Sequence, residues 1–363
     1  MSIMEAKRDR PYHLELKAGQ AVLWCRCGRS ARQPYCDGSH AGTGVEPVRY
    51  RAPQDEDVLL CGCKRTATPP HCDGSHNASA AAYGLDDPDS PENRTIVAVA
   101  PGPDGKARID GGCYVCNLDA RPWHRVAGAR WTDLIAASDG ARWQAQFCLD
   151  VEPGTGPVVA FGDRHAALLV LDSHGSLEIS GRTFAIDTRV PGDTSRRAEI
   201  GAYVKPGEAF RLRNDGDAPM RVFASVAPTL EAPDFPPTMR GRFDDAHPGR
   251  LASVDPAQRQ AMADRFFQVM VSKAHGSTML TQFIGEIPRS KAWPHRHLYE
   301  ESLIVVSGEG TMWTETRKTA VRTGDVIFLP RKQKHSLECT SDVPMFVAGV
   351  IYPGDNPSIN YYD

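Results

Sequence analysis

The sequence has no uninterrupted apolar run near the roughly 18 residues of a membrane-spanning helix, so we expect no membrane partner. It has no long basic run and a formal net charge of −3, which argues against a nucleic-acid partner. Residues 1–19 lack the apolar core of a secretory signal. These absences predict a cytoplasmic protein, and 363 residues can form two or three domains with separate cores.

Cysteine is present and concentrated, because six of the ten cysteines lie in two copies of one pattern, 36 residues apart. The copies are Cys25-Arg-Cys27, eight residues and Cys36-Asp-Gly-Ser-His40, then Cys61-Gly-Cys63, eight residues and Cys72-Asp-Gly-Ser-His76. Three thiolates and one imidazole form a soft ligand set, suited to zinc or an iron–sulfur cluster. In a cytosolic chain, such spacing indicates metal binding before it indicates disulfides.

Both copies resemble the CDGSH iron–sulfur family, to which mitoNEET-type proteins belong. The match extends to Pro34-Tyr-Cys36 and to Pro69-Pro70 before Cys72. The resemblance implies two 2Fe–2S clusters, held by Cys25, Cys27, Cys36 and His40 and by Cys61, Cys63, Cys72 and His76. A histidine ligand raises the reduction potential relative to four cysteines, which suits electron transfer. The alternatives are structural zinc sites, or clusters that only stabilise a small domain.

The rest of the chain indicates a mainly β protein. Short apolar runs separated by Gly, Pro, Asn and Asp predict antiparallel strands of a sandwich or barrel. Asp255-Pro256 predicts the start of a helix that continues to about Met270, with Asp as N-cap. We expect the module at 1–80, a linker at 81–101, a first barrel at 102–232, a Pro-rich connection with the helix at 233–270 and a second barrel at 271–363.

The second barrel contains a candidate metal site. His295 and His297 stand two apart, so on a strand they point to the same face, and Glu301 and His335 follow. Three imidazoles and one carboxylate suit Fe(II), Mn(II), Ni(II), Cu(II) or Zn(II). Four ligands leave coordination positions open, as a catalytic metal requires.

The spacing of these residues resembles the two motifs of the cupin superfamily. The first motif is matched by His295, His297, Glu301 and Gly308, and the second by Gly324, Pro330 and His335. The resemblance implies a jelly-roll barrel in which the three histidines and the glutamate bind one metal. A metal site without catalysis, as in storage or sensor cupins, is the alternative.

The first barrel also resembles a cupin, but a degenerate one. Aligning Gly175 with Gly308 places Gly162, Arg164 and Leu168 at the first-motif ligand positions, and Phe210 stands where the last histidine would be. The neighbouring His165 is expected to face the other side of its strand. We therefore predict a bicupin whose first barrel is structural and binds no metal.

A redox module joined to an open metal site is similar in function to Rieske-type oxygenases, which is an analogy and not a claim of homology. The hypothesis is an Fe(II)-dependent oxygenase or oxidase that uses O2 and a small organic substrate, with electrons from an external donor. One alternative is a cupin dioxygenase or isomerase with protective or structural clusters. The other is a non-enzymatic iron or redox sensor. Association into a homo-oligomer through the cupin sheets is also expected.

Five other residues belong to these predictions. Trp293, Trp313 and Phe328 are candidates to line or cap the substrate pocket, with ordinary core packing as the alternative. Cys113 and Cys116 have the C-x-x-C form of a redox pair or half a zinc site. Because no second matched pair follows, we favour two reduced cysteines of ordinary structural kind.

Overall fold

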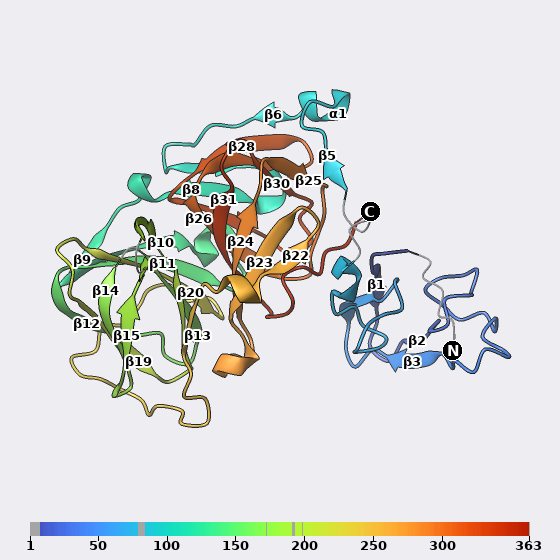
Figure 1. Cartoon of the computed structure of the whole chain (residues 1–363), viewed down its shortest axis with the longest axis horizontal. Coiled ribbons are helices and arrows are strands. Elements are labelled where there is room, and N and C mark those ends of the chain that lie inside the picture. The colour runs from blue at the N-terminus through green and yellow to red at the C-terminus, as the bar shows by residue number, and fades with distance from the viewer. Residues whose placement is uncertain (1–7, 79–83, 172, 191–192, 198, 363) are drawn as a thin grey trace.

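The computed structural model describes residues 8–78, 84–171, 173–190, 193–197 and 199–362. It is mainly β and has three parts, with the second barrel lying between the module and the first barrel (Figure 1). The described helices are the short α1 (Pro91–Arg94) and single 3-10 turns at Ser75–Ala78, Asp110–Gly112, Leu118–Ala120, Ala137–Asp139, Pro256–Gln258 and Lys273–His275. None of these described helices has the length and apolar character needed to span a bilayer.

The module is one folded unit built from two strand pairs. Its strands are β1 (Tyr12–Leu16), β2 (Ala21–Trp24), β3 (Val48–Arg51) and β4 (Glu56–Leu60). β1 pairs with β4, and β2 pairs with β3. The indole of Trp24 is buried in the small core, and its Nε1 donates to the carbonyl oxygen of Cys61 at 3.0 Å. This bond joins the strand before the first CDGSH copy to the first ligand of the second copy.

The first barrel consists of a seven-stranded sheet, a four-stranded sheet and a small strand pair. The seven strands are β9 (His124–Val126), β10 (Ala129–Ile135), β11 (Ala145–Val151), β13 (His165–Leu171), β18 (Ile200–Val204), β20 (Met220–Ala227) and β21 (Leu251–Ser253). The others are β12 (Gly154–Ala160), β14 (His174–Ile179), β15 (Arg182–Asp187) and β19 (Ala209–Asn214), with the pair β16 (Arg189–Val190) and β17 (Asp193–Arg197). An apolar core lies between the two larger sheets.

The second barrel has an eight-stranded and a six-stranded sheet. The eight strands are β7 (Lys106–Arg108), β8 (Tyr114–Asn117), β22 (Gln260–Met262), β23 (Arg265–Val271), β24 (Thr281–Ile287), β26 (Glu300–Ser307), β29 (Asp325–Leu329) and β31 (Met345–Tyr352). The six are β5 (Leu85–Asp86), β6 (Val97–Ala98), β25 (Ser290–Ala292), β27 (Glu309–Trp313), β28 (Arg317–Arg322) and β30 (Ser336–Cys339). Its larger sheet packs on the larger sheet of the first barrel through a shared apolar cluster.

The predicted division of the chain needs two corrections in its middle. Residues 81–101 were expected to be a linker, but β5 and β6 add edge strands to the second barrel (Figure 1). Residues 106–117 were assigned to the first barrel, but β7 and β8 extend the larger sheet of the second barrel. Edge strands this short carry few apolar residues, so their sequence does not show which sheet they join.

The predicted helix from Asp255 to Met270 is wrong. The Asp255 side chain does accept from the backbone N–H of Ala257, but only the 3-10 turn at residues 256–258 follows. The chain then forms β22 and β23. An Asp cap serves a single turn as well as a long helix, and the aromatic and β-branched residues from Phe266 onward favour a strand.

Candidate functional site

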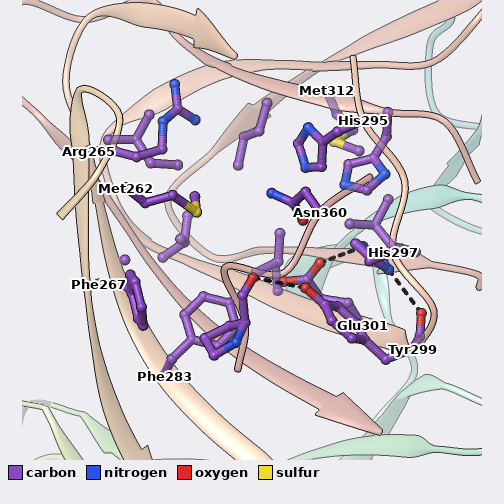
Figure 2. Close-up of a pocket in the computed structure, with 18 of the residues that line it drawn as sticks. Met262, Arg265, Phe267, Phe283, His295, His297, Tyr299, Glu301, Met312 and Asn360 are labelled. Carbon is purple, nitrogen blue, oxygen red and sulfur yellow. Dashed lines mark hydrogen bonds and ion pairs between the residues drawn. The ribbon is translucent and has the colours of Figure 1, made fainter. Parts of the chain in front are cut away.

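The four residues predicted to bind one metal lie together at the wall of a cavity in the second barrel (Figure 2). His295 and His297 follow β25, Glu301 lies at the start of β26, and His335 precedes β30. Two backbone hydrogen bonds of 3.0 Å join His295 and His335 and bring their ring centres to 4.5 Å. The His297 ring lies 4.8 Å from that of His335, and its Nε2 lies 3.0 Å from Oε2 of Glu301.

Backbone carbonyls orient all three imidazoles. The Nδ1 contacts are His295 to Trp293 O at 2.8 Å, His297 to Tyr299 O at 3.0 Å and His335 to Gln333 O at 2.8 Å. Because a carbonyl oxygen only accepts, each Nδ1 carries a proton and each Nε2 of a neutral ring keeps its lone pair. Hydrogen bonds of this kind fix the orientation of metal-binding histidines.

The donor set fits a divalent metal ion. One ligand atom each from His297, Glu301 and His335 lies within 4.8 Å of the other two. The buried Nε2 of His297 makes no hydrogen bond with any described residue. Burial lowers the pKa of His295 to about 3 and the pKa of His335 well below its usual value, so both rings stay neutral at pH 7. Neutral imidazole is the form that binds metals, so His297, Glu301 and His335 are placed to hold one ion. His295, the fourth predicted ligand, lies outside this group of three, with its ring 4.5 Å from that of His335.

The cavity beside these side chains is largely apolar. Its volume, taken as the space open to the centre of a water molecule, is about 90 Å³. Apolar residues from several strands form its walls, including Phe267, Phe283, Leu303, Met312, Leu329 and Val347. Apolar walls around a few polar side chains are the usual composition of a small-molecule site.

The predicted aromatic lining is wrong for two of three residues. Met312 and Leu329 face the cavity, so their strand neighbours Trp313 and Phe328 point to the opposite faces of β27 and β29. Phe328 packs in the contact between the barrels. Trp293 is 42% exposed and lines a smaller pocket next to the cavity.

Three polar residues outside the predicted set also line the cavity, namely Arg265 on β23, Tyr299, and Asn360 beyond β31. The Tyr299 ring stacks on His297 with 4.0 Å between ring centres, and its hydroxyl donates to Pro357 O at 2.9 Å. No motif spacing marks these residues. Only the fold brings them to the metal ligands.

Glu300, next to the predicted ligand Glu301, does not line the metal cavity but contacts the first barrel. It points to the first barrel, where its carboxylate accepts three backbone N–H groups, from Arg142 at 2.8 Å, Trp143 at 2.9 Å and Gln144 at 3.2 Å. Burial raises its pKa, while these three hydrogen bonds oppose the shift. Neighbouring residues of β26 point to opposite faces of the sheet. Glu301 therefore faces the metal cluster when Glu300 faces the first barrel, in agreement with the prediction that Glu301 is the ligand.

In each CDGSH copy the four predicted ligands form two close pairs. The distances are 3.7 Å for Cys25 to Cys27, 3.2 Å for Cys36 to His40 Nδ1, 3.6 Å for Cys61 to Cys63 and 3.4 Å for Cys72 to His76 Nδ1. All eight residues are described, and no three of these ligand atoms lie within 4.8 Å of one another. One tetrahedral zinc ion would bring all four ligand atoms of a copy to within ~4 Å of one another, because its bonds to sulfur and nitrogen are short. Two separate pairs fit a two-iron cluster better.

The two copies differ in their surroundings. Cys36 and His40 of the first copy are partly exposed, whereas burial of His76 in the second lowers its pKa to about 4. Both motif glycines have positive φ, but a Cβ on Gly38 would meet nothing within 4 Å. A Cβ on Gly74 would lie 2.7 Å from the Asn356 side chain. The second copy is therefore the one that packs against the barrel.

The module lies beside the second barrel (Figure 1). Two kinds of side-chain contact hold it there. Asp57 accepts from Lys332 at 2.6 Å and from Arg331 at 3.2 Å, and both cations belong to the loop that leads to His335. The segment after β31, residues 353–362, is called here the tail segment. Its contacts are Asn356 Nδ2 to Asp73 O at 3.1 Å, Asn77 Nδ2 to Ser358 O at 3.2 Å, the Tyr361–His13 stack at 4.6 Å and the packing of Ile359 with Cys72.

Apolar side chains fill the interior of the first barrel. Leu168 and Phe210, at two of the four positions where a cupin ligand would stand, belong to its apolar core. Gly162 and Arg164 lie in the turn before β13. Among the described residues, this barrel holds no group of three side chains placed to bind a metal.

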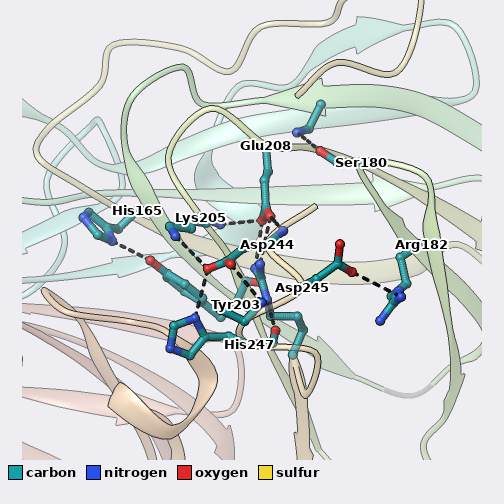
Figure 3. A network of polar contacts seen from close by, with 12 residues as sticks. His165, Ser180, Arg182, Tyr203, Lys205, Glu208, Asp244, Asp245 and His247 are labelled. Carbon is teal, nitrogen blue, oxygen red and sulfur yellow. Dashed lines mark hydrogen bonds and ion pairs between the residues drawn. The ribbon is translucent and has the colours of Figure 1, made fainter. Parts of the chain in front are cut away.

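A polar network around a buried ion pair lies outside this core (Figure 3). Arg250 forms two hydrogen bonds of 2.8 Å with Glu208, both side chains being almost fully buried. His165 faces away from the core, as predicted, and bonds the Tyr203 hydroxyl at 2.6 Å. The network fastens residues 244–250 to the outside of the barrel.

Cys113 and Cys116 lie in different apolar clusters, the first in the second barrel and the other between the barrels. Both are free thiols. Burial raises the pKa of Cys113, and it raises that of Cys116 to about 11. These features agree with the favoured interpretation of reduced, structural cysteines.

Comparison with known proteins identifies both parts. A family model described as an iron-binding zinc finger of CDGSH type matches residues 4–41, and a cupin domain model matches residues 286–351. The mitochondrial CDGSH iron-sulfur domain-containing protein 3 of Mus musculus is 52% identical over 44 residues, or 12% of this chain and 32% of the relative. Its Homo sapiens counterpart is 50% identical over 44 residues, or 12% and 35%. The chain thus spans about a third of the length of these relatives.

Solved structures resemble the two barrels. The Lactobacillus farciminis oxalate decarboxylase in a formate complex has a TM-score of 0.50 and 12% identity, covering 66% of this chain and 86% of that one. Procruciferin, an 11S globulin of Brassica napus, has a TM-score of 0.53 and 11% identity, covering 66% and 84%. One is an enzyme and the other a globulin, so the shared fold does not select an activity.

Proposed function

We propose that this chain, which joins a CDGSH-type iron-binding module to a cupin domain, is an iron-dependent oxygenase or oxidase of a small organic substrate. His295, His297, Glu301 and His335 hold one iron ion, and the two sets of three cysteines and one histidine hold 2Fe–2S clusters. Electrons pass from an external donor through the module to the barrel. O2 is the oxidant.

The observation that supports an electron path is the position of the second copy beside the metal cavity. Cys72 and Tyr299 line the same groove between the module and the barrel. Tyr299 also stacks on His297, so one side chain borders both the groove and a metal ligand. Because electron transfer slows steeply with distance, the placement of Cys72 on a groove that Tyr299 also borders favours exchange between the two centres. The partly exposed Cys36 and His40 leave the first copy accessible to a donor.

The side chains of the cavity suit this chemistry. Glu301 supplies one negative charge and the three histidines supply neutral nitrogens, a set that binds Fe(II) among other ions. When bound, the iron supplies one-electron redox chemistry toward O2. The carbonyl of Tyr299 keeps the proton of His297 on Nδ1. The apolar walls exclude water from the substrate and from reactive products.

The test is stopped-flow absorbance of anaerobically purified protein whose iron and acid-labile sulfide have been determined. Reduced protein is mixed with O2, and cluster reoxidation is followed in the wild type and in His335→Ala, which lacks a barrel ligand. We expect reoxidation at least ~10-fold slower in His335→Ala, a ~1.4 kcal/mol change in barrier. His124→Ala, at an exposed position on the first barrel, is the matched control. Equal rates in all three proteins would refute the relay.

A second candidate is a cupin dioxygenase or isomerase in which the module only clamps the tail segment. It is favoured by Asn356 and Ser358, which contact the module on the same segment that carries Asn360 into the cavity. His76→Cys distinguishes the candidates, because a fourth cysteine ligand lowers the cluster potential but leaves the clamp in place. Slower turnover with the cluster retained supports the relay, and unchanged turnover supports the clamp.

A further inference from the structure

The metal cavity has one strongly basic residue in its lining. Among the described residues that line it, Arg265 is the only lysine or arginine, and its side chain is 8% exposed. Arg265 begins β23, and Figure 2 shows it across the cavity from His297. A guanidinium stays charged at any pH of interest and cannot be neutralised to lower the cost of burial. Its charge therefore needs partners in this apolar setting.

Hydrogen bonds within the chain use only some of the N–H donors of this guanidinium. Nε donates to Asp264 Oδ1 at 3.1 Å, and Nη2 donates to Ser290 Oγ at 3.2 Å. Nη1 makes no hydrogen bond with any described residue. Asp264 lines the smaller neighbouring pocket and not the metal cavity. One edge of Arg265 thus remains available to an acceptor that enters the cavity.

Asn360 presents a second unused polar group to the same space. Its residue is 3% exposed, and its side chain points into the cavity (Figure 2). The backbone N–H of Asn360 donates to Ser358 O at 3.1 Å, but its side-chain amide makes no hydrogen bond with described residues. Buried amides are normally paired. Arg265, Asn360 and His295 also all line the smaller pocket, which places them close together at one end of the cavity.

We propose that the substrate of the function proposed above is a small monocarboxylic acid with an apolar body. Its carboxylate binds Nη1 of Arg265 and the amide of Asn360, and its body packs against Phe267, Phe283 and Met312. A carboxylate matches the planar donors of an arginine. Arg265 is paired on one edge with Asp264, so it suits a single added negative charge. A phosphate dianion or a compact diacid would bring a second charge, for which the described lining of the cavity offers no cation apart from the bound metal. This inference rests on the metal cavity being the substrate site, and it needs no electron transfer.

Calorimetric titration of the cluster-containing protein with Zn(II) in the barrel tests the proposal without O2 or reductant, so a failed relay does not affect the result. The probes are 3-phenylpropanoate, hexanoate, the uncharged 3-phenylpropanamide, oxalate and phenyl phosphate. In the wild type we expect both monoacids to bind at least ~10-fold more tightly than the amide, oxalate or phenyl phosphate. If neither monoacid binds with a Kd below ~10 mM, or if the amide, oxalate or phenyl phosphate binds as well, the proposal is overturned.

Variants assign the binding to Arg265. Arg265→Met should weaken 3-phenylpropanoate binding about 30-fold and leave amide binding unchanged, since only the acid uses the charge. Arg265→Lys keeps the charge without the planar donors and should give an intermediate Kd. Arg289→Met, at an exposed arginine paired with Asp342, is the matched control and should bind as the wild type does. Unchanged acid binding in both Arg265 variants would overturn the proposal, and the comparison of acid with amide in the wild type stands even if a variant fails to fold.

Discussion

Replacing Glu300 and Glu301 by glutamine, one at a time, should separate the stability of the barrel pair from metal binding. The two residues are adjacent and chemically identical, but β26 turns them to opposite faces. Glu301 lies in the metal cluster, whereas Glu300 accepts the three backbone N–H groups of residues 142–144. Each variant is therefore a control for the other.

The cost of Glu300→Gln follows from its geometry. Glutamine keeps one acceptor oxygen, which can serve Trp143 and Gln144, but its NH2 group then meets the N–H of Arg142. Two hydrogen bonds lose their charged acceptor, at ~1 kcal/mol each, and one buried donor loses its partner at a cost of about 1–3 kcal/mol. We expect a loss of about 3–5 kcal/mol in the free energy of unfolding. Glu301→Gln should cost under ~1 kcal/mol in metal-free protein, because it breaks no such set of bonds.

Urea unfolding of metal-free protein at pH 8, followed by tryptophan fluorescence, measures the stability difference. The alkaline pH keeps Glu300 ionised, since burial raises its pKa. Metal analysis after reconstitution should give one equivalent of barrel metal for Glu300→Gln and at least ~10-fold weaker retention for Glu301→Gln. If Glu300→Gln also loses the metal while keeping its stability, the two roles have been assigned the wrong way round.

Asp57→Asn weakens the contact between the module and Lys332 of the second barrel. Amide hydrogen exchange in the tail segment should therefore become faster, while the barrel metal is retained. Unchanged exchange would contradict the docking of the module on the barrel. A chelator should lower the melting temperature of the wild type but not that of His335→Ala, because a metal that binds only the folded state stabilises that state. Equal shifts of the melting temperature in both proteins would contradict a metal site at His335. Burial by itself raises the pKa of Asp150, but hydrogen bonds from Arg221 and Arg130 outweigh it and hold the pKa below its ordinary value. Its stabilisation is therefore present above about pH 4 and lost as the pH falls through the lowered folded pKa. Asp150→Asn should cost about 1–3 kcal/mol at pH 7 and clearly less at pH 3 in urea unfolding, and an equal cost at both would count against this pairing.

The positions that come together in the second barrel could be predicted because their spacing reflects strand geometry. His295 and His297 share a face at a separation of two residues, and Gly324 and Pro330 mark the turns around the strand before His335. The same reasoning identified Leu168 and Phe210 as apolar replacements in the first barrel. These predictions depend on local sequence alone.

The remaining features depend on contacts between distant segments. Arg265 and Asn360 reach one cavity from segments 95 residues apart, and no periodicity relates them. Trp313 and Phe328 were expected at that cavity, but a shift of one position on a strand turns a side chain to the other face. The docking of the module depends on Asp57 and Lys332, two charged residues of a common kind, so nothing in their local sequence marks them as an interface.

The tail segment also sets an order of assembly during synthesis. About 290 residues separate Cys72 from Ser358, so at 5–20 residues per second the second CDGSH copy leaves the ribosome roughly 15–60 s before the segment that covers it. During that interval its ligands are open to whatever delivers iron and sulfide. Once the tail segment packs against Cys72, the second copy is less exposed than the first, whose Cys36 and His40 stay partly open to solvent. The two copies of one motif are therefore expected to have different opportunities for repair.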